Sequence, residues 1–263
     1  MDSFAKHLKH LLMKRAVIII LILSVQIMQS QNISTDRPDQ TESSKTLDKG
    51  SFQLESGLVL LKDNDANFRS FAAPSNLIRY GIFNGFELRF MTQHESVTHE
   101  LEGGNRKYSG LNDLELGFKV QLFQKEDSNT EIAFLSHIIL PTASKGLGHD
   151  KAGLINKLAI AHELSESIGL GYNLGYDHID SNHFFTYSVA LGLTISESLA
   201  CYIEPYGSLG ASGYFENNFD FGITVLLNPN FQLDTSYGFG LNNDVHYLSA
   251  GFSWHVPHLF SKN

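Results

Sequence analysis

The stretch Ser167–Asp177 reads SIGLGYNLGYD, and its residues alternate in size and polarity. Large apolar side chains stand at every second position from Ile168 to Tyr176, and small or polar residues fill the positions between them. Because successive side chains of a β-strand point to opposite faces, this pattern predicts a strand with one apolar face and one small, polar face. The stretch also has the length of about 9–11 residues that a tilted strand needs to cross a membrane.

The same two-residue period persists from Gly50 to Val256 and predicts 12 strands. Their ranges are 51–61, 76–82, 86–97, 111–124, 131–140, 156–165, 167–177, 183–196, 199–209, 218–228, 231–242 and 244–256. The range 131–140 fits least well because it is apolar on both faces. Short turns alternate with mostly longer connections, as in outer-membrane barrels, and an even strand number places both chain ends on the short-turn, periplasmic side. The sequence therefore predicts an all-β fold, a single antiparallel transmembrane β-barrel of about 12 strands.

The first 30 residues have the pattern of a cleaved signal peptide. Lys14 and Arg15 precede the apolar run Ala16–Val25, and small and polar residues follow it. A retained membrane anchor is the alternative interpretation. These 30 residues carry four basic side chains against one acidic one, so their removal takes the net charge from −9 to −12 and argues against nucleic acid as a partner. The expected division is a signal peptide over 1–30, a periplasmic N-terminal arm over 31–49, the barrel over 50–257 and a C-terminal tail over 258–263.

The placement of aromatic residues favours a membrane barrel over a secreted, soluble β-sandwich. A sandwich explains the alternation of side chains but not the unequal lengths of the connections. Aromatic residues occupy the apolar faces, many near strand ends, at the level of the aromatic girdles of membrane barrels: Phe86, Tyr172, Tyr176, Phe185, Phe219, Phe231, Tyr237 and Trp254. We therefore expect the apolar faces to meet the lipid of a Gram-negative outer membrane and the polar faces to line the lumen. A single cysteine, Cys201, excludes an intrachain disulfide.

Two segments resemble a known family. The residues T-D-R-P-D-Q-T-E-S at 35–43 with K-G-S-F-Q-L-E-S-G at 49–57 are similar to the opening of the meta-pathway phenol-degradation transporter family. The residues N-L-I-R-Y-G-I at 76–82 followed by F-E-L-R at 86–89 are similar to its next hairpin. The resemblance is specific over residues 35–90 and becomes general barrel patterning through 256. It implies an outer-membrane barrel with a transport role.

The polar faces carry charges of both signs, with acids in excess. The candidate lumen-lining residues are Glu55, Arg79, Glu87, Arg89, Asp113, Glu115, Lys119, Lys157, Glu163, Asp177, Glu204, Asp220 and Asp234. Such residues either handle a solute or hold the barrel together through ion pairs, with Arg79 and Arg89 facing acids such as Glu87 and Glu115. Twelve strands enclose less space than the 16–18 of open porins, so any pore is expected to be narrow or partly plugged. The charged arm supplies a candidate plug: Asp36, Arg37, Asp39 and Glu42.

Catalytic and metal sites are not predicted. The nearest match to an outer-membrane lipid hydrolase is His178 with Ser181, whose spacing of three places them on opposite faces of a strand, and no G-x-S-x-G element is present. The histidine pairs 94/99 and 178/183 lack the tight spacing of metal ligands. We expect no cofactor and no enzyme activity. The expected function is a narrow channel or transporter for small, apolar or aromatic solutes, with outer-membrane lipid and a small solute as partners. The alternative is a closed structural or adhesive barrel whose outer loop 141–155 binds a partner or folds inward.

Overall fold

The computed structural model describes residues 33–125 and 128–259, and the predicted signal peptide over 1–30 lies outside them. No helix among these residues is long and apolar enough to cross a membrane. The strands in chain order are β1 (Phe52–Asp63), β2 (Phe68–Phe83), β3 (Phe86–His99), β4 (Arg106–Leu111), β5 (Leu114–Phe123), β6 (Thr130–Leu140), β7 (Gly153–Ser165), β8 (Ile168–Ile179), β9 (Asn182–Ser196), β10 (Leu199–Gly210), β11 (Phe215–Asn228), β12 (Phe231–Gly240) and β13 (Val245–Val256).

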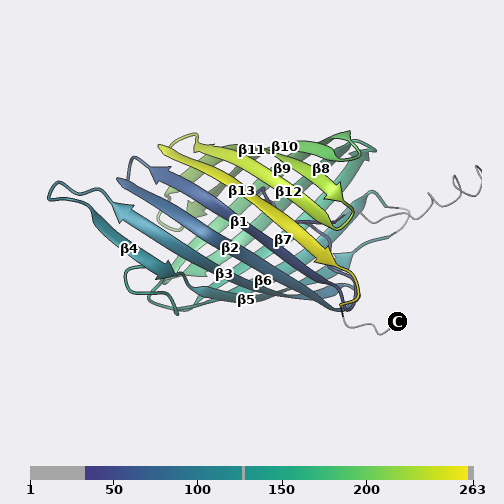
Figure 1. Ribbon diagram of the computed structural model, residues 1–263, viewed down its shortest axis with the longest axis horizontal. Helices are drawn as coiled ribbons and strands as arrows, with labels where there is room; N and C mark the ends of the chain where they lie inside the picture. Colours follow the sequence, from purple (N-terminus) through teal and green to yellow (C-terminus); the bar gives the residue numbers. More distant parts are fainter. Residues whose placement is uncertain (1–32, 126–127, 260–263) are drawn as a thin grey trace, which may run out of the picture. The chain divides into compact units, whose positions relative to one another are not determined.

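These strands form one antiparallel sheet that closes on itself (Figure 1). The closing pair is β1 with β13, which runs in continuous register from Phe52 opposite Val256 to Asp63 opposite Val245. Closure leaves no sheet edge with unpaired backbone N–H and C=O groups. A β-protein can cross a lipid bilayer only in this way, because lipid offers no hydrogen-bond partners. The predicted barrel is therefore confirmed.

The thirteen strands occupy twelve positions around the barrel because β4 and β5 share one. The half of β3 from His94 to His99 pairs with β4, and the half from Phe86 to Met91 pairs with β5. The predicted strand 111–124 is thus interrupted at residues 112–113. Its continuation, β4, belongs to a hairpin that extends past the other strands (Figure 1).

The predicted connections differ from the observed ones at the loop end of the barrel. Residues 68–75 belong to β2, so the predicted connection 62–75 shrinks to a turn at 64–67. The predicted loop 178–182 is a two-residue turn at Asp180–Ser181, where both residues adopt positive φ. The register shifts between Ala72 and Ser75, and this shift disturbs the alternation of side chains. The two-residue period therefore did not predict the part of β2 before residue 76. The difference between short and long connections is consequently smaller than predicted, and residues 141–152 form the longest described loop.

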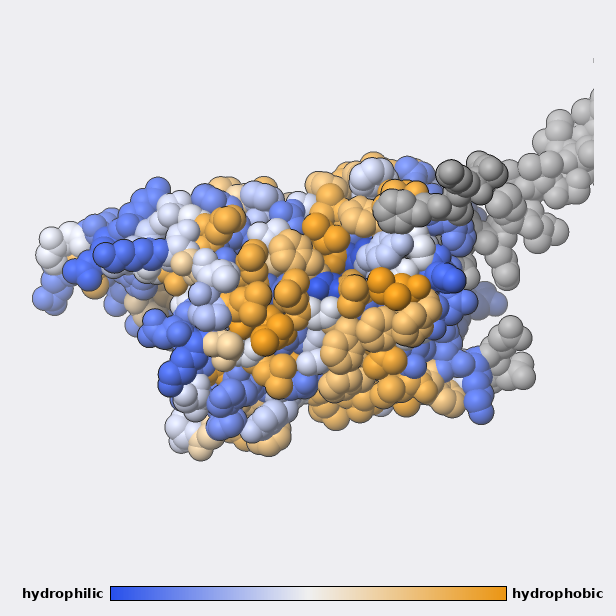
Figure 2. All heavy atoms as spheres, turned by 90° about the horizontal axis from the view of Figure 1, so that it is seen from below, coloured by the Kyte–Doolittle hydropathy of each residue, from blue (hydrophilic) through white to orange (hydrophobic). Residues whose placement is uncertain are grey.

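The polarity of the two faces is inverted relative to a soluble protein. Charged residues such as Arg79, Glu87 and Lys119 are fully buried inside the barrel, whereas Leu174 and Phe185 on the outer face are 57% and 63% exposed. Figure 2 shows apolar side chains as a belt across the visible face, bounded by hydrophilic residues at both ends. An apolar belt around a polar interior is the arrangement of membrane barrels and not of sandwiches.

Candidate functional site

The segment 33–50, called the arm below, lies inside the barrel and contacts the wall on several sides. Its backbone N–H groups donate to inward side chains of four different strands: Asp36 to Glu55 on β1, Gln40 to Glu204 on β10, Glu42 to Asn173 on β8 and Leu47 to Glu87 on β3. An extended segment has no backbone partners of its own, so these carboxylate and amide oxygens take their place. The polar interior is therefore arranged around the arm.

Asp36 is the centre of a buried ion-pair network. Its carboxylate lies 2.6 Å from the guanidinium of Arg89, 2.9 Å from the ammonium of Lys119 and 3.2 Å from the guanidinium of Arg79. Burial alone would raise the pKa of Asp36, but the charges of Arg79, Lys119 and Arg89 together outweigh burial and hold the pKa well below its usual range. Asp36 is therefore a charged group held by three cations of β2, β3 and β5.

Arg79 and Arg89 also form ion pairs with carboxylates of neighbouring strands and of the arm. Arg79 Nε lies 2.8 Å from Glu87 and Arg79 Nη1 lies 3.0 Å from Glu55. Arg89 bridges to Glu42 of the arm at 2.6 Å. A buried charge is costly unless it is paired and hydrogen-bonded, and each arginine here meets that condition.

Arg37 contacts a different part of the wall from Asp36. Its guanidinium lies 2.9 Å from Asp234 on β12 and donates to the hydroxyl of Ser249 on β13. The paired residues beneath it are Gly57 and Gly251, and a Cβ atom on either would come within 2.5 Å of Arg37 Nη2. The glycines thus make the space in which the guanidinium lies.

Asp39 lies in an acidic and phenolic part of the lumen. Burial, followed by the neighbouring charge of Glu204, raises the pKa of Asp39 well above its usual value. Glu204 accepts a hydrogen bond from Thr41, and Asp220 accepts one from the hydroxyl of Tyr247. The two arm aspartates are therefore in opposite electrostatic surroundings, Asp36 among cations and Asp39 among acids.

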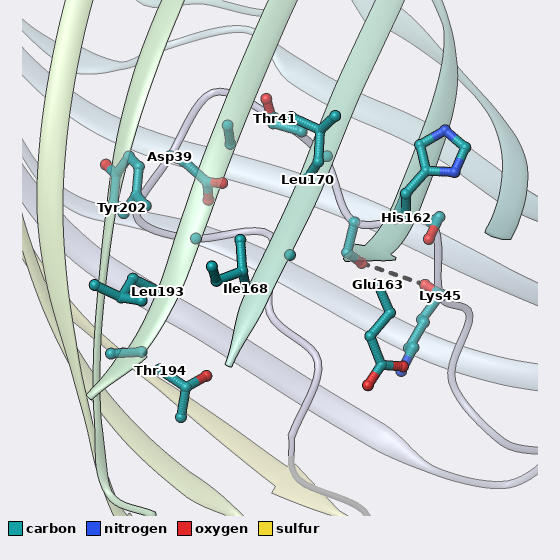
Figure 3. A pocket seen from close by; sticks show the side chains of 18 of the residues that line it. Asp39, Thr41, Lys45, His162, Glu163, Ile168, Leu170, Leu193, Thr194 and Tyr202 are labelled. Carbon is teal, nitrogen blue, oxygen red and sulfur yellow. Dashed lines mark hydrogen bonds between the residues drawn. The ribbon is translucent and has the colours of Figure 1, made fainter. Parts of the chain in front are cut away.

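Two cavities lie on opposite sides of the arm. The terminus-side cavity, of about 520 Å³, is bordered by Asp39, Thr41 and Lys45 of the arm and by Tyr202 and Glu163 of the wall (Figure 3). It also borders Gly169 and Gly171, the small face of the stretch that predicts the fold.

The loop-side cavity has a volume of about 450 Å³ and a mixed wall. Its apolar lining includes Leu61, Met91 and Leu135, and Lys157 and Tyr206 are among its polar groups. Both cavities share four lining residues, all from the arm: Arg37, Pro38, Asp39 and Glu42. This part of the arm is therefore the partition between them.

The structure places most of the candidate lumen residues in the buried interior. Glu115 and Lys157 are half-buried, Glu163 is exposed at the rim of the terminus-side cavity, and the remaining ten are buried: Glu55, Arg79, Glu87, Arg89, Asp113, Lys119, Asp177, Glu204, Asp220 and Asp234. Glu115 lies 3.1 Å from His137 and not beside an arginine.

Asp113 has a different environment from the other acids. It lies in the break between β4 and β5, where its carboxylate accepts backbone N–H groups of Thr142, Ala143 and His149. It therefore holds the 141–152 loop against the rim of the barrel.

Sequence reasoning missed two kinds of interior residue. His137 accepts a hydrogen bond from Arg89 Nε, but it lies in a stretch that reads as apolar on both faces. Tyr202, Tyr206 and Tyr247 lie on the polar faces that the strand alternation predicts and face inward among the acids, but the list of candidate lumen residues, which holds only charged side chains, leaves them out. Their positions in the strand alternation, shared with Glu204 and Ser249, are the signal that identifies them.

His178 and Ser181, the nearest match to a hydrolase pair, do not contact each other through their side chains in any described hydrogen bond. The imidazole of His178 contacts that of His183, with Nδ1 atoms 3.1 Å apart, whereas the hydroxyl of Ser181 accepts a hydrogen bond from Lys151. No group of three or more His, Cys, Asp or Glu residues in the described ranges is arranged to hold a metal ion.

Comparison with known proteins identifies the family. The model of the family described as "Putative MetA-pathway of phenol degradation" matches residues 35–254. The chain belongs to this family. No curated protein matches it by sequence.

Solved structures with the same fold include channels and translocators. An outer-membrane channel from Pseudomonas putida F1 is 14% identical with a TM-score of 0.62, covering 85% of this chain and 100% of that one. The KdgM porin in complex with oligogalacturonate is 10% identical with a TM-score of 0.54, covering 77% and 98%. The β domain of the Bordetella autotransporter BrkA is 12% identical with a TM-score of 0.52, covering 80% and 100%. At these identities the likeness establishes the fold, an outer-membrane β-barrel, which agrees with the apolar outer belt.

Proposed function

We propose that this protein is a narrow outer-membrane channel for small organic solutes and that the arm controls passage through it. The observation that carries the proposal is the pair of cavities separated only by arm residues. A solute that enters one cavity reaches the other when the segment from Arg37 to Glu42 moves aside. Because this segment is extended and bound through side-chain contacts, it moves without breaking the barrel's own strand pairing.

The residues that line the loop-side cavity are suited to a solute with an apolar body. Val59, Leu61, Met91 and Leu135 give it a hydrophobic side, and Lys157 gives it a cation. Membership in a family described by phenol degradation is consistent with an aromatic solute. A closed structural barrel is the alternative, and its lumen would carry no current.

Deletion of part of the arm tests the proposal in planar lipid bilayers. Removing residues 33–45 joins the two cavities, so we expect the single-channel conductance to rise several-fold over that of the full chain. Lys45→Gln is the matched control because Lys45 is half-exposed and the one ion pair it forms among the residues that the structure describes, with Glu131, is long at 3.7 Å. Folding of each variant is checked by its heat-dependent electrophoretic mobility. A folded deletion variant with unchanged or absent conductance would count against an arm-controlled channel.

Liposome swelling rates test which class of solute passes through the channel. Liposomes containing the deletion variant are expected to swell faster in benzoate than in a disaccharide of equal osmolarity, because the loop-side cavity offers one apolar wall and one cation. Equal rates would remove the support for an aromatic solute while leaving the channel itself intact.

A further inference from the structure

Three basic side chains form a row on the outer face of the barrel, at its loop end. The strand register aligns Lys62 on β1 with Arg69 on β2, Arg69 with Thr98 on β3, and Thr98 with Lys107 on β4. On the other side, Lys62 aligns with His246 of β13. Lys62, Arg69 and Lys107 are exposed. Adjacent strands lie about 4.8 Å apart, so the three cations extend over about 15 Å.

An apolar row lies next to this basic row, toward the middle of the belt. The register aligns Tyr237, Leu248, Leu60 and Phe71 across β12, β13, β1 and β2. Leu60, Phe71 and Leu248 are exposed to between 44% and 47%. The hydroxyl of Tyr237 is hydrogen-bonded to His246, which joins the two rows. Together they line a shallow hollow of about 730 Å³ on the outside of the barrel.

The clustering of these cations is specific to this part of the barrel. The other lysine and arginine residues of the described strands, Arg79, Arg89, Lys119 and Lys157, point into the lumen, and Arg106 lies on the opposite face of β4 from Lys107. The outward-facing lysine and arginine residues of the described strands are therefore confined to β1, β2 and β4, which lie in a run of four neighbouring strands with β3 (Figure 1).

Nearby acids neutralise the basic row only partly. Glu100 lies 3.7 Å from Arg69, with both side chains about half-exposed, and Asp244 is hydrogen-bonded to His246. Exposed pairs of this kind contribute little and leave a cation available for another anion.

We propose that this face is a binding site for a phosphorylated lipid of the outer leaflet. The basic row binds the phosphates, and the apolar row below it contacts the acyl chains. A lipid headgroup is favoured over free phosphate because the cations lie directly at the edge of the apolar belt, where a bilayer places its headgroups. The length of the row suits a disaccharide headgroup with two phosphates, since Lys62 and Lys107 lie too far apart to bind one phosphate together.

Native mass spectrometry of the folded, detergent-solubilised full-length barrel tests this site, with bisphosphorylated lipid A as the probe. The triple variant Lys62→Gln, Arg69→Gln, Lys107→Gln is expected to bind the lipid about 100-fold more weakly, since each basic residue near an anionic lipid surface contributes about a factor of five. The matched control carries the same charge change away from the row, with Lys151 beside Ser181 at the turn between β8 and β9: Lys49→Gln, Lys125→Gln, Lys151→Gln. It is expected to bind like the wild type.

Two measurements on the wild-type protein make the test independent of how the variant folds. Dephosphorylated lipid A is expected to bind at least tenfold more weakly than the bisphosphorylated form, and high salt is expected to weaken binding of the latter. Inorganic phosphate at millimolar concentration is expected not to displace the lipid. The proposal is overturned if the triple variant folds and binds like the control, if the dephosphorylated lipid binds equally well, or if inorganic phosphate alone competes fully.

Discussion

Replacing Asp36 with Asn is expected to open the channel. The substitution removes the one carboxylate shared by Arg79, Arg89 and Lys119 and leaves three buried cations with fewer partners. Breaking a buried ion pair from one side costs about 3 kcal/mol or more, which corresponds to an increase on the order of 100-fold in the fraction of time that the arm is displaced. The measurement is the open probability of single channels in planar bilayers.

Asp39→Asn is the matched control for that experiment. Both aspartates belong to the arm, but desolvation and the charge of Glu204 raise the pKa of Asp39, so its ionised form is already disfavoured. Asparagine carries no charge and is expected to leave the open probability unchanged or lower it. Equal opening by both variants would show that the general loss of a carboxylate, rather than the cation network at Asp36, is responsible.

The contributions of Asp36 and Asp39 to the stability of the folded protein change with pH in opposite directions. The pKa of Asp36 is lowered in the folded protein, so its stabilising contribution is present above the unfolded-state pKa and is lost as pH falls through the folded-state pKa. The pKa of Asp39 is raised, so its contribution is present at low pH and is lost as pH rises through its folded-state pKa. The arm is therefore bound most firmly between these two limits.

The second large effect is expected for Arg79→Met. Arg79 is fully buried and contacts Asp36, Glu55 and Glu87, so methionine leaves three carboxylates in the interior without their common partner. We expect the free energy of unfolding to fall by about 3–5 kcal/mol. Urea unfolding of the protein in zwitterionic phospholipid vesicles measures this change.

Arg69→Met on the same strand provides the comparison. Arg69 is about half-exposed on the outer face, and its ion pair with Glu100 is 3.7 Å long. Exposed pairs contribute less than about 1 kcal/mol, so the change should be small. A loss of equal size in both variants would mean that the interior network adds no more to stability than a surface charge does.

The barrel and its two faces follow directly from the sequence because a two-residue period needs only local information. Leu174 and Asn173, adjacent in the chain, lie on the outer and inner face as that period predicts. The period fails where the geometry is irregular, as at the shifted register of β2 and the break before Asp113. It also fails at β6, because Leu135 and Ile139 face inward although they are apolar.

The course of the arm could not be predicted by the same means. The charges of the arm predict ion-pair partners in the lumen, but some of those partners come from strands more than a hundred residues away, as Arg37 with Asp234 illustrates. Which arm charge meets which wall charge depends on the closure of the barrel. The loop-side cavity likewise requires the three-dimensional arrangement, since Val59, Met91 and Lys157 meet only there.

A reversible cross-link between arm and wall tests most directly whether displacement of the arm opens the lumen. The hydroxyls of Thr41 and Ser188 lie 2.7 Å apart, so Thr41→Cys with Ser188→Cys places two thiols in position for a disulfide, in a Cys201→Ser background that removes the native thiol. Combined with Asp36→Asn, the oxidised protein is expected to show the low conductance of the wild type, and reduction is expected to restore the high open probability. High conductance in the fully oxidised protein would contradict the account, because the solute path would then be open with the arm fixed in place.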